Sequence, residues 1–507
     1  MIFELDRDSH IPLYAQIVFR VREMISSGAL KIGDRLPASR DLARTLGVNR
    51  NTVAYAYEEL EADALVNSQV GRGTYISSVP ATPARTAAPP KREISAYPWE
   101  ADFAHLRQDP WLGGMLRFKH QASNAISFAY SLPQPELLPI EKFRAAIDRA
   151  ARRDGRAVIE MGDSLGYAPL REYLATQMGL SGIKASPDEI LITNGCQQAL
   201  SLLQSALVQA GDAVAIENPT YSGALSVFCR GGQKFVPVPM DENGINLELV
   251  EEAFSRHAPK LLYTIPTFQN PTGVTTTLAA RRQLVDLSIK YRVPVIEDDI
   301  YSELRYDGPA VPPLKALDEH GTVIHVSSFS KIGFAGLRVG WIMGARALIQ
   351  QLALVKQKLD LHTATLTQAS IYEFSRHGLL ARHMKRARKA YRQRRDAMIE
   401  ALERHFPEEA SWNNPEGGMA LWVRLPDGFD TEQLLIQAYE KGVLFSPASH
   451  FYAGAPRQNM LRLSFTSTPP EAIEAGVRTL GSIVKRELAG LRRRPVYDAA
   501  PGFKALV

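Results

Sequence analysis

Cysteine is scarce in this chain of 507 residues, which contains only Cys196 and Cys229. Two cysteines cannot build a disulfide framework, and their spacing offers no zinc ligands, so we predict a reducing compartment and no metal site. No apolar run approaches the length of about 18 residues that suggests a membrane-spanning helix. The first residues, MIFELDRDSH, also lack the charged-then-apolar pattern of a signal peptide. These absences predict a cytoplasmic protein with no membrane partner.

An excess of charge of one sign is missing as well. The formal net charge is only +5, so any contact with nucleic acid requires a local arrangement of Lys and Arg. Internal repeats are absent. The apolar content of 45% argues against disorder, and the length allows about three domains.

The first 78 residues show the pattern of a small helical module. Apolar residues recur at helical spacing over residues 12–26, and a short helix, SRDLARTL, follows, which Ser39 can cap. Gly47-Val48 then provides a tight turn into a third helix with Asn49 as its N-cap. The sequence therefore predicts helix, turn and helix.

The start of this third helix carries exposed polar residues. Arg50, Asn51 and Thr52 occupy its first turn, where a recognition helix meets base edges. Two β-prone runs around Gly71-Arg72-Gly73 predict a hairpin whose tip approaches a phosphate backbone. The pattern of three helices and a hairpin is also compatible with a structural or dimerisation role.

The remaining chain divides by composition. Residues 79–98 are rich in Pro and Ala and predict a semi-rigid linker between a DNA-binding domain at 1–78 and a larger domain at 99–507. In the larger domain, apolar runs such as EILIT, AVAIE and LLYTI alternate with helical segments, which predicts an α/β fold with a mostly parallel sheet. From about residue 361 the pattern predicts a smaller α+β subdomain.

A lysine in the larger domain is surrounded by groups that bind phosphate. Ser330-Lys331 lies close to Ser328 and Arg338. Pyridoxal 5'-phosphate (PLP) requires this combination, because an amine forms a Schiff base with its aldehyde while fixed donors hold its phosphate. We therefore predict a PLP site.

Other segments supply the residue types that such a site needs. Gly195-Cys196-Gln197 follows a strand and begins a helix, where backbone N–H groups favour phosphate. Tyr221 is a candidate for stacking on the pyridine ring, although a tyrosine there can simply pack. Asn270 can donate to the ring phenolate, Asp298 can keep the pyridine nitrogen protonated, and Tyr301 lies on the O3' side.

Residues 12–77 resemble the GntR-type winged helix-turn-helix, with the segments LPASRDLA, VNRNTV and GRGTY all in order. The resemblance implies DNA contacts by Arg40, Arg50 and Thr52. It also implies contacts by the hairpin residues Gly71, Arg72, Gly73 and Thr74.

Residues 125–487 resemble a fold type I aminotransferase, because the phosphate cradle, stacking ring, Asn, Asp, Tyr and SSFSKIGFAGLRVG occur in the order typical of that family. The resemblance implies that Lys331 is the Schiff-base lysine, with Asp298 and Tyr301 as catalytic neighbours. It also implies that Arg462 receives a substrate carboxylate through both arms of its guanidinium. An arginine in a strand can also pair only locally.

The whole chain resembles the MocR/GabR subfamily of bacterial GntR-type regulators. The resemblance implies a PLP-dependent transcriptional regulator that forms a homodimer, binds operator DNA and is nucleoid-associated when bound. It also implies that an amino acid or amine effector is sensed by forming an external aldimine in place of the one at Lys331. The alternatives are an active aminotransferase for aminoadipate-like or aromatic amino acids, and a DNA-binding protein with a vestigial site.

Three positions depart from the aminotransferase pattern. Met161 stands where the family has a tyrosine that reaches the partner subunit's phosphate, Ser131 replaces a glycine beside the substrate loop, and Ala335 replaces a proline. Lys331 and Asp298 remain. We therefore expect PLP binding and a residual half reaction, with enzymatic turnover not the primary role.

Overall fold

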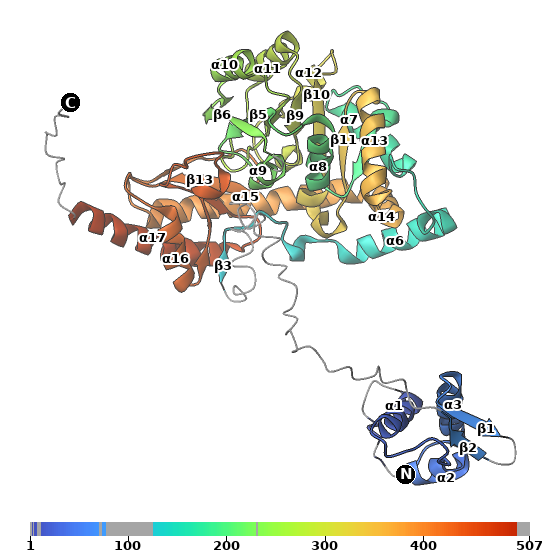
Figure 1. Cartoon of the computed structure of the whole chain (residues 1–507). Helices are drawn as coiled ribbons and strands as arrows, with labels where there is room; N and C mark the ends of the chain where they lie inside the picture. Colours follow the sequence, from blue (N-terminus) through green and yellow to red (C-terminus); the bar gives the residue numbers. More distant parts are fainter. Residues whose placement is uncertain are drawn as a thin grey trace, which may run out of the picture. The chain divides into compact units, whose positions relative to one another are not determined.

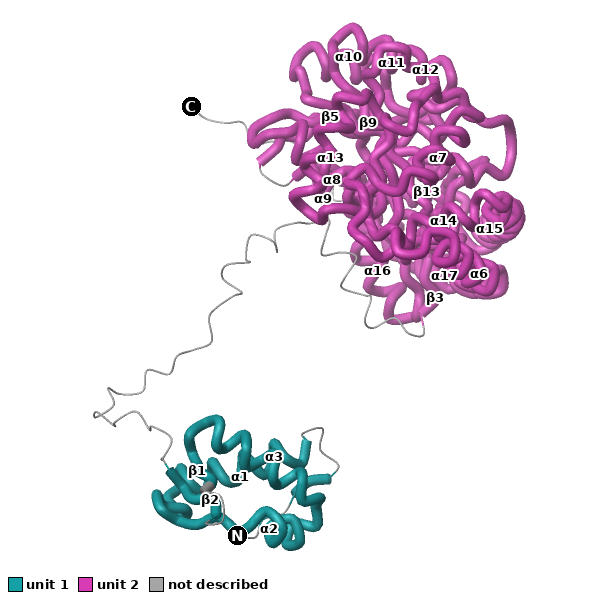
Figure 2. The backbone as a smooth tube through the Cα atoms, turned by 90° about the vertical axis from the view of Figure 1, so that its right-hand side faces the viewer, with its two compact units in different colours: residues 1–101 teal, residues 102–507 magenta. Residues whose placement is uncertain are grey.

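The computed structural model describes residues 3, 5–7, 12–69, 73–77, 125–229 and 232–493. The chain divides into two compact units, residues 1–101 and 102–507 (Figure 1, Figure 2). The predicted linker at 79–98 lies outside the described residues, as do Gly71 and Arg72 at the tip of the hairpin. Within the described ranges, no helix combines the length and apolar character needed to cross a membrane.

The N-terminal unit contains three helices and a hairpin: α1 (Leu13–Ser26), α2 (Ser39–Leu46), α3 (Arg50–Ala62), β1 (Val66–Gln69) and β2 (Gly73–Ile76). All three helices contribute to one buried core, with Ile17 from α1, Leu42 from α2 and Val53 from α3. The hairpin strands are antiparallel, and the N–H of Leu36 donates to the carbonyl of Thr74 at 2.9 Å, which ties the hairpin to the preceding segment. The predicted winged helix-turn-helix is confirmed.

The turn between α2 and α3 depends on two residues. Gly47 ends α2 in the left-handed conformation, with φ of 67°, and the Asn49 side chain accepts a hydrogen bond from the N–H of Asn51 at 2.9 Å. The predicted cap at Ser39 is wrong. Ala38 takes the N-cap position, and Ser39 is already the first helical residue, so its hydroxyl makes no cap bond.

The large unit is built around an eight-stranded sheet in the order β4-β11-β10-β9-β8-β5-β6-β7. The strands are β4 (Ile190–Thr193), β5 (Ala213–Asn218), β6 (Lys234–Asp241), β7 (Gly244–Ile245), β8 (Leu262–Thr264), β9 (Val295–Asp298), β10 (Val323–Ser328) and β11 (Gly340–Met343). The pairings among β6, β5, β8, β9 and β10 are parallel, while β11 and β7 are antiparallel to their neighbours. The predicted mostly parallel sheet is confirmed.

Both faces of the sheet are covered by helices. Along β5, Val214 and Ile216 belong to one core and Ala215 to another, because successive side chains of a strand point to opposite faces. The core around Ala215 includes residues of α10 (Leu247–His257), α11 (Leu278–Tyr291) and α12 (Leu314–Leu317). The other core includes α7 (Ala168–Leu180), α8 (Cys196–Leu207), α9 (Ser222–Phe228) and α13 (Arg346–Asp360).

A smaller antiparallel sheet occupies the C-terminal part, in the order β12-β13-β16-β15. Its strands are β12 (Ser411–Trp412), β13 (Ala420–Arg424), β15 (Ser446–Pro447) and β16 (Met460–Ser464). The helices of this part and its surroundings are α6 (Ile140–Asp154), α14 (Thr365–Arg376), α15 (Leu379–His405), α16 (Thr431–Glu440) and α17 (Pro470–Arg493). β3 (Ile126–Ser127) pairs with β14 (Val443–Leu444), so the first described residues of the large unit also contact this part.

Candidate cofactor site and DNA-binding surface

The residues predicted for the cofactor follow the ends of strands that run in the same direction. β4 ends just before Gly195, β9 ends at Asp298, and β10 ends at Ser328, immediately before the turn that carries Lys331. In open α/β sheets, ligands bind outside the carboxyl ends of the strands. The topology therefore gathers at one edge residues that lie far apart in the sequence.

Lys331 lies in a short helical turn, Ser330–Phe334, and its side chain is half-buried. Its Nζ donates a hydrogen bond to the carbonyl of Ser131 at 2.8 Å. Burial, assisted by the positive charge of Arg462, lowers the pKa of Lys331 to about 8, although Asp298 acts in the opposite direction. A large fraction of this amine is thus neutral, and therefore nucleophilic, in mildly alkaline solution.

Asp298 is completely buried, and only one of its two carboxylate oxygens is satisfied. Oδ2 accepts hydrogen bonds from the Tyr263 hydroxyl at 2.6 Å and from the Cys196 thiol at 3.5 Å. Oδ1 has no hydrogen-bond partner among the described residues. Burial raises the pKa of Asp298 to about 6. An unsatisfied buried carboxylate oxygen is costly, so the site is prepared for an external N–H donor.

Hydroxyl and guanidinium groups form a cradle beside Lys331. The Ser328 and Ser330 hydroxyls are hydrogen-bonded at 2.8 Å, and Nη1 of Arg338 donates to the Ser330 hydroxyl at 3.3 Å. Nη2 of Arg338 donates to the carbonyl of Asn194 at 3.2 Å, next to the start of α8. A Cβ on Gly195, where φ is 81°, would lie only 2.5 Å from Nη2 of Arg338. The close approach of this guanidinium therefore requires glycine.

Tyr221, Gln197 and Tyr301 lie near this cradle. The Tyr221 hydroxyl donates to Oε1 of Gln197 at 3.2 Å, and Nε2 of Gln197 donates to the carbonyl of Gly223 at 3.1 Å. Burial raises the pKa of both Tyr221 and Tyr301, so both phenols stay protonated at neutral pH. Tyr301 and Asn270 border the same small cavity as Ser131.

Arg462 extends from β16 into this region and is only 3% exposed. Its Nη1 donates to Oδ1 of Asn270 at 2.7 Å, and its Nη2 donates to the carbonyl of Ala129 at 2.6 Å and to the Ser446 hydroxyl at 3.2 Å. Its guanidinium carbon lies 4.8 Å from the centre of the Phe451 ring. Because Oδ1 of Asn270 accepts from Arg462, the amide nitrogen of Asn270 is left to donate elsewhere.

Sequence reasoning did not assign site roles to Tyr263 or to the carbonyl of Ser131. Tyr263 holds Asp298 from β8, and the only signal in the sequence was a tyrosine within the apolar run LLYTI. The thiol of Cys196 also contacts Asp298, whereas the sequence suggested only a backbone contribution at that position.

In the N-terminal unit, the described residues at the starts of α2 and α3 that are predicted to contact DNA are accessible. Arg40, Arg50 and Asn51 are exposed and Thr52 is half-buried, all at the beginnings of α2 and α3. Neither Arg40 nor Arg50 forms an ion pair with another described residue. Thr74 pairs with Ser68 across the hairpin, with their hydroxyls 3.1 Å apart.

Two family matches together cover most of the chain. Residues 13–76 match bacterial regulatory proteins of the gntR family, and residues 129–480 match class I and II aminotransferases. A Bacillus subtilis protein described as the uncharacterized HTH-type transcriptional regulator YdfD is 33% identical, covering 94% of this chain and 97% of its own length. The probable rhizopine catabolism regulatory protein MocR of Rhizobium meliloti is 29% identical, covering 94% of this chain and 95% of its own length.

The large unit also resembles solved aminotransferase structures. An α-aminoadipate aminotransferase from Thermus thermophilus, solved with N-(5'-phosphopyridoxyl)-L-leucine, has 36% identity and a TM-score of 0.71. The match covers 78% of this chain and all of that structure. The residues of this chain fit PLP, because Asp298 Oδ1 has no donor in the described part of the chain and the hydroxyls of Ser328 and Ser330 adjoin Arg338 beside an amine of lowered pKa.

Proposed function

Because the chain belongs to the MocR-type family, in which a gntR-family DNA-binding domain is joined to a class I and II aminotransferase domain, we propose that it is a PLP-dependent transcriptional regulator. An amino acid or amine is the effector, and operator DNA is the macromolecular partner. In the bacterial cell, this function places it in the cytoplasm, and at the nucleoid when it is bound to DNA.

One observation carries the proposal. A single chain combines an exposed recognition-helix start at Arg50 with a half-buried lysine whose pKa is lowered to about 8, beside a carboxylate oxygen that lacks a donor among the described residues. An ordinary metabolic enzyme does not need the first feature, and an ordinary DNA-binding domain does not need the second. A regulator that responds to an amine needs both.

We assign the residues of the large unit as follows. Lys331 holds the cofactor covalently, Asp298 Oδ1 accepts from the pyridine nitrogen, and Ser328, Ser330 and Arg338 bind the phosphate. When bound, PLP supplies an aldehyde that condenses with primary amines. Arg462 receives the carboxylate of an amino acid effector, which replaces Asn270 as its hydrogen-bond partner.

A homodimer is part of the proposal. Ile159 and Met161 are 80% and 78% exposed, and Leu359 and Leu361 are 62% and 51% exposed. The two segments are adjacent, because a Cβ on Gly162 would meet the side chain of His362 at 3.0 Å. Four exposed apolar side chains in neighbouring segments favour a contact with a second copy.

A working aminotransferase is the second candidate function. Its support is the retention of Lys331, Asp298 and Arg462, together with 36% identity to an aminotransferase whose full length is covered. Met161 argues against a working aminotransferase, because its exposed thioether cannot replace the phenol that contacts the partner subunit's phosphate in that family. We therefore propose that turnover, where it occurs, is limited to a half reaction.

The test is a spectral titration of the purified protein, loaded with PLP, against a panel of amino acids and amines. Each compound that changes the absorbance is then used in footprinting on the DNA upstream of the chain's own gene. A regulator changes its footprint with such a compound. Sustained turnover of an amino donor and a keto acid, with no effect on any footprint, would instead establish the enzyme.

A further inference from the structure

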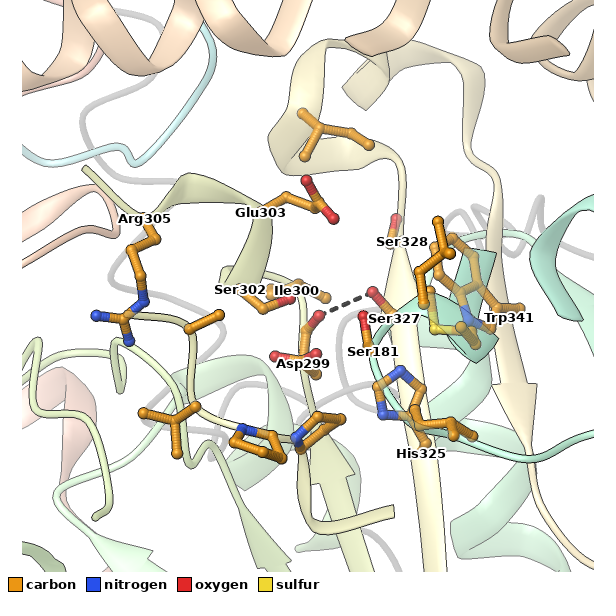
Figure 3. A pocket seen from close by; sticks show the side chains of 18 of the residues that line it. Ser181, Asp299, Ile300, Ser302, Glu303, Arg305, His325, Ser327, Ser328 and Trp341 are labelled. Atoms are coloured by element: carbon orange, nitrogen blue, oxygen red, sulfur yellow. Dashed lines mark hydrogen bonds between the residues drawn. The ribbon is translucent and has the colours of Figure 1, made fainter. Parts of the chain in front are cut away.

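A separate pocket of about 610 Å³ borders β10 and β11, and Figure 3 shows the side chains of Asp299, His325 and Trp341 around it. His325 and Ser327 of β10 line it, and they point to the face opposite Val326 because successive side chains alternate. Asp298 pairs with Val326 in the neighbouring strand, so it faces away from His325. We call this cavity the rear pocket.

The rear pocket is lined by buried polar atoms without partners. Four atoms have no hydrogen-bond partner among the described residues: Oδ1 of Asp299, Nη2 of Arg305, Nε2 of His325 and Nε1 of Trp341. Asp299 is 8% exposed, His325 is 1% exposed and Trp341 is 4% exposed. Buried polar groups are normally satisfied, so four unsatisfied groups around one cavity indicate a ligand that supplies their partners.

The unsatisfied groups define what this ligand must carry. Nδ1 of His325 contacts Oε2 of Glu297 at 3.1 Å. Burial lowers the pKa of His325, but this hydrogen bond and the charge of Glu297 outweigh it, so the pKa is raised. Arg305 and Trp341 are donors, whereas Asp299 offers an acceptor. The ligand therefore presents an acceptor to Arg305 and Trp341 and a donor to Asp299.

The rest of the wall combines an apolar surface with the charged side chains of Glu303 and Arg388. Met178, Ile183 and Ile332 line the pocket, along with Pro312 and Pro313. This surface suits a branched or aromatic side chain, and the volume lies in the usual range for small-molecule sites.

We propose that the rear pocket binds a small acid with a neighbouring donor, either an amino acid or a 2-hydroxy acid with an apolar side chain. Its amino or hydroxyl group donates to Asp299, and its carboxylate accepts from Arg305 and Trp341. Ser328 and Ile332 also border the pocket, on either side of Lys331 in sequence. A ligand here acts on the cofactor loop from behind and remains distinct from an effector at Arg462.

The proposal is tested by calorimetry on the cofactor-loaded full chain with L-phenyllactate and L-2-hydroxyisocaproate. Neither probe has a primary amine, so neither condenses with PLP. Ser181 lines the pocket and is exposed, so Ser181→Trp adds a bulky side chain to the wall without removing a polar partner. Lys184→Trp is the matched control, because Lys184 is exposed in the same loop and does not line the pocket.

We expect both acids to bind the natural protein and Lys184→Trp equally, and Ser181→Trp at least about tenfold more weakly. Asp299→Asn should weaken binding by about ten- to hundredfold, because it replaces a charged acceptor. If a thermal melt shows that Asp299→Asn does not fold, the comparison of acid binding by Ser181→Trp and Lys184→Trp still tests the proposal.

Arg462→Ala distinguishes binding in the rear pocket from binding at the effector site of Arg462. Binding that survives in Arg462→Ala and is lost in Ser181→Trp supports the rear pocket. Binding that is lost in Arg462→Ala and kept in Ser181→Trp belongs to the effector site and overturns the proposal. Absence of binding to either acid at about 10 mM also overturns it, whether or not amines bind PLP.

Discussion

The burial of Lys331 sets the chemical behaviour of the amine. Its pKa is lowered to about 8 from the ordinary lysine value of 10.5. Only the neutral amine attacks an aldehyde, so in cofactor-free protein the rate of reaction with PLP should rise with pH and level off above about 8. Stopped-flow absorbance across a pH series measures this rate.

Lys331→Ala is the control for that experiment. This variant should fold and should give no adduct with PLP that borohydride can fix to the protein. A borohydride-fixed adduct of unchanged yield would show that another lysine holds the cofactor. A rate that keeps rising to pH values near the ordinary lysine pKa would show that burial does not tune this amine.

The two donor arms of Arg462 matter for carboxylate binding through their geometry as well as their charge. In Arg462→Lys the charge remains, but the two-pronged donor is lost, so effectors with an α-carboxylate should lose about 1.5–3 kcal/mol of binding free energy. Simple amines should lose little. Spectral titration of an amino acid and its decarboxylated amine measures both affinities. An equal loss for the two ligands would exclude Arg462 as the carboxylate site.

Several side chains at the cofactor site were predictable because motifs mark them. Lys331 follows three serines in SSFSK, and Asp298 comes at the end of an apolar run in VPVIEDD. The hydrogen bond from Arg462 to Asn270 was not predictable, because the two residues are 192 positions apart and only the packing of two sheets brings them together. The support of Asp298 by Tyr263 depends on strand order in the same way.

At the level of elements, the connection from β4 to α8 provides the next test. Gly195 has φ of 81°, and a Cβ there would collide with Arg338. Gly195→Ala should displace this guanidinium and weaken PLP binding by about 1.5–3 kcal/mol, the range for a hydrogen bond to a charged group. Fluorescence titration of cofactor-free protein measures the affinity.

Gly211→Ala is the matched control for the steric effect. Gly211 has a similar φ of 86°, but open space surrounds its missing Cβ. This variant should lose about 1–2 kcal/mol of folding stability from backbone strain and keep its affinity for PLP. If both variants weaken PLP binding equally, strain rather than collision explains the requirement for glycine.

The recognition helix and the hairpin should contribute differently to DNA binding. Arg50→Ala should cost about 1–3 kcal/mol on the operator and relax its sequence preference, whereas Arg72→Ala should weaken binding to all sequences and lower the salt slope by about one. Gel-shift titrations at several salt concentrations measure both. Arg20→Ala on α1 is the control, because Arg20 is exposed and paired with Glu23 at 2.8 Å. Loss of PLP binding in Arg50→Ala or Arg72→Ala would contradict the assignment of these two residues to DNA binding.

The strands differed in how clearly the sequence marked them. β5, β8, β9 and β10 were visible as apolar runs between helices, since strands buried on both faces are apolar throughout. β11 was not assigned, although it lies between β4 and β10. Its antiparallel insertion depends on pairing with partners remote in sequence, which a local pattern does not contain. The pairing of β3 with β14 is another example.

The whole molecule raises the question of how the two compact units communicate. The predicted linker, residues 79–98, is rich in Pro and Ala and lies outside the described residues. Pro-rich segments extend by about 3.1 Å per residue, so deleting about ten residues removes roughly 30 Å of reach. Half-sites of a dimeric regulator are spaced by about 34–36 Å, one turn of DNA. A deletion of this size is therefore comparable to the distance that two DNA-binding domains must cover.

If the linker acts only through its length, its composition should have little effect on the response to effector. Replacement of residues 79–98 by a Gly/Ser sequence of equal length should leave PLP and effector binding unchanged and weaken operator binding only modestly. Deletion of about ten residues should abolish the effector-dependent footprint, because both DNA-binding domains no longer reach their half-sites. Footprinting of both variants with and without effector makes the comparison. A normal response in the shortened chain, or a complete loss in the Gly/Ser chain, would mean that the segment itself transmits the signal.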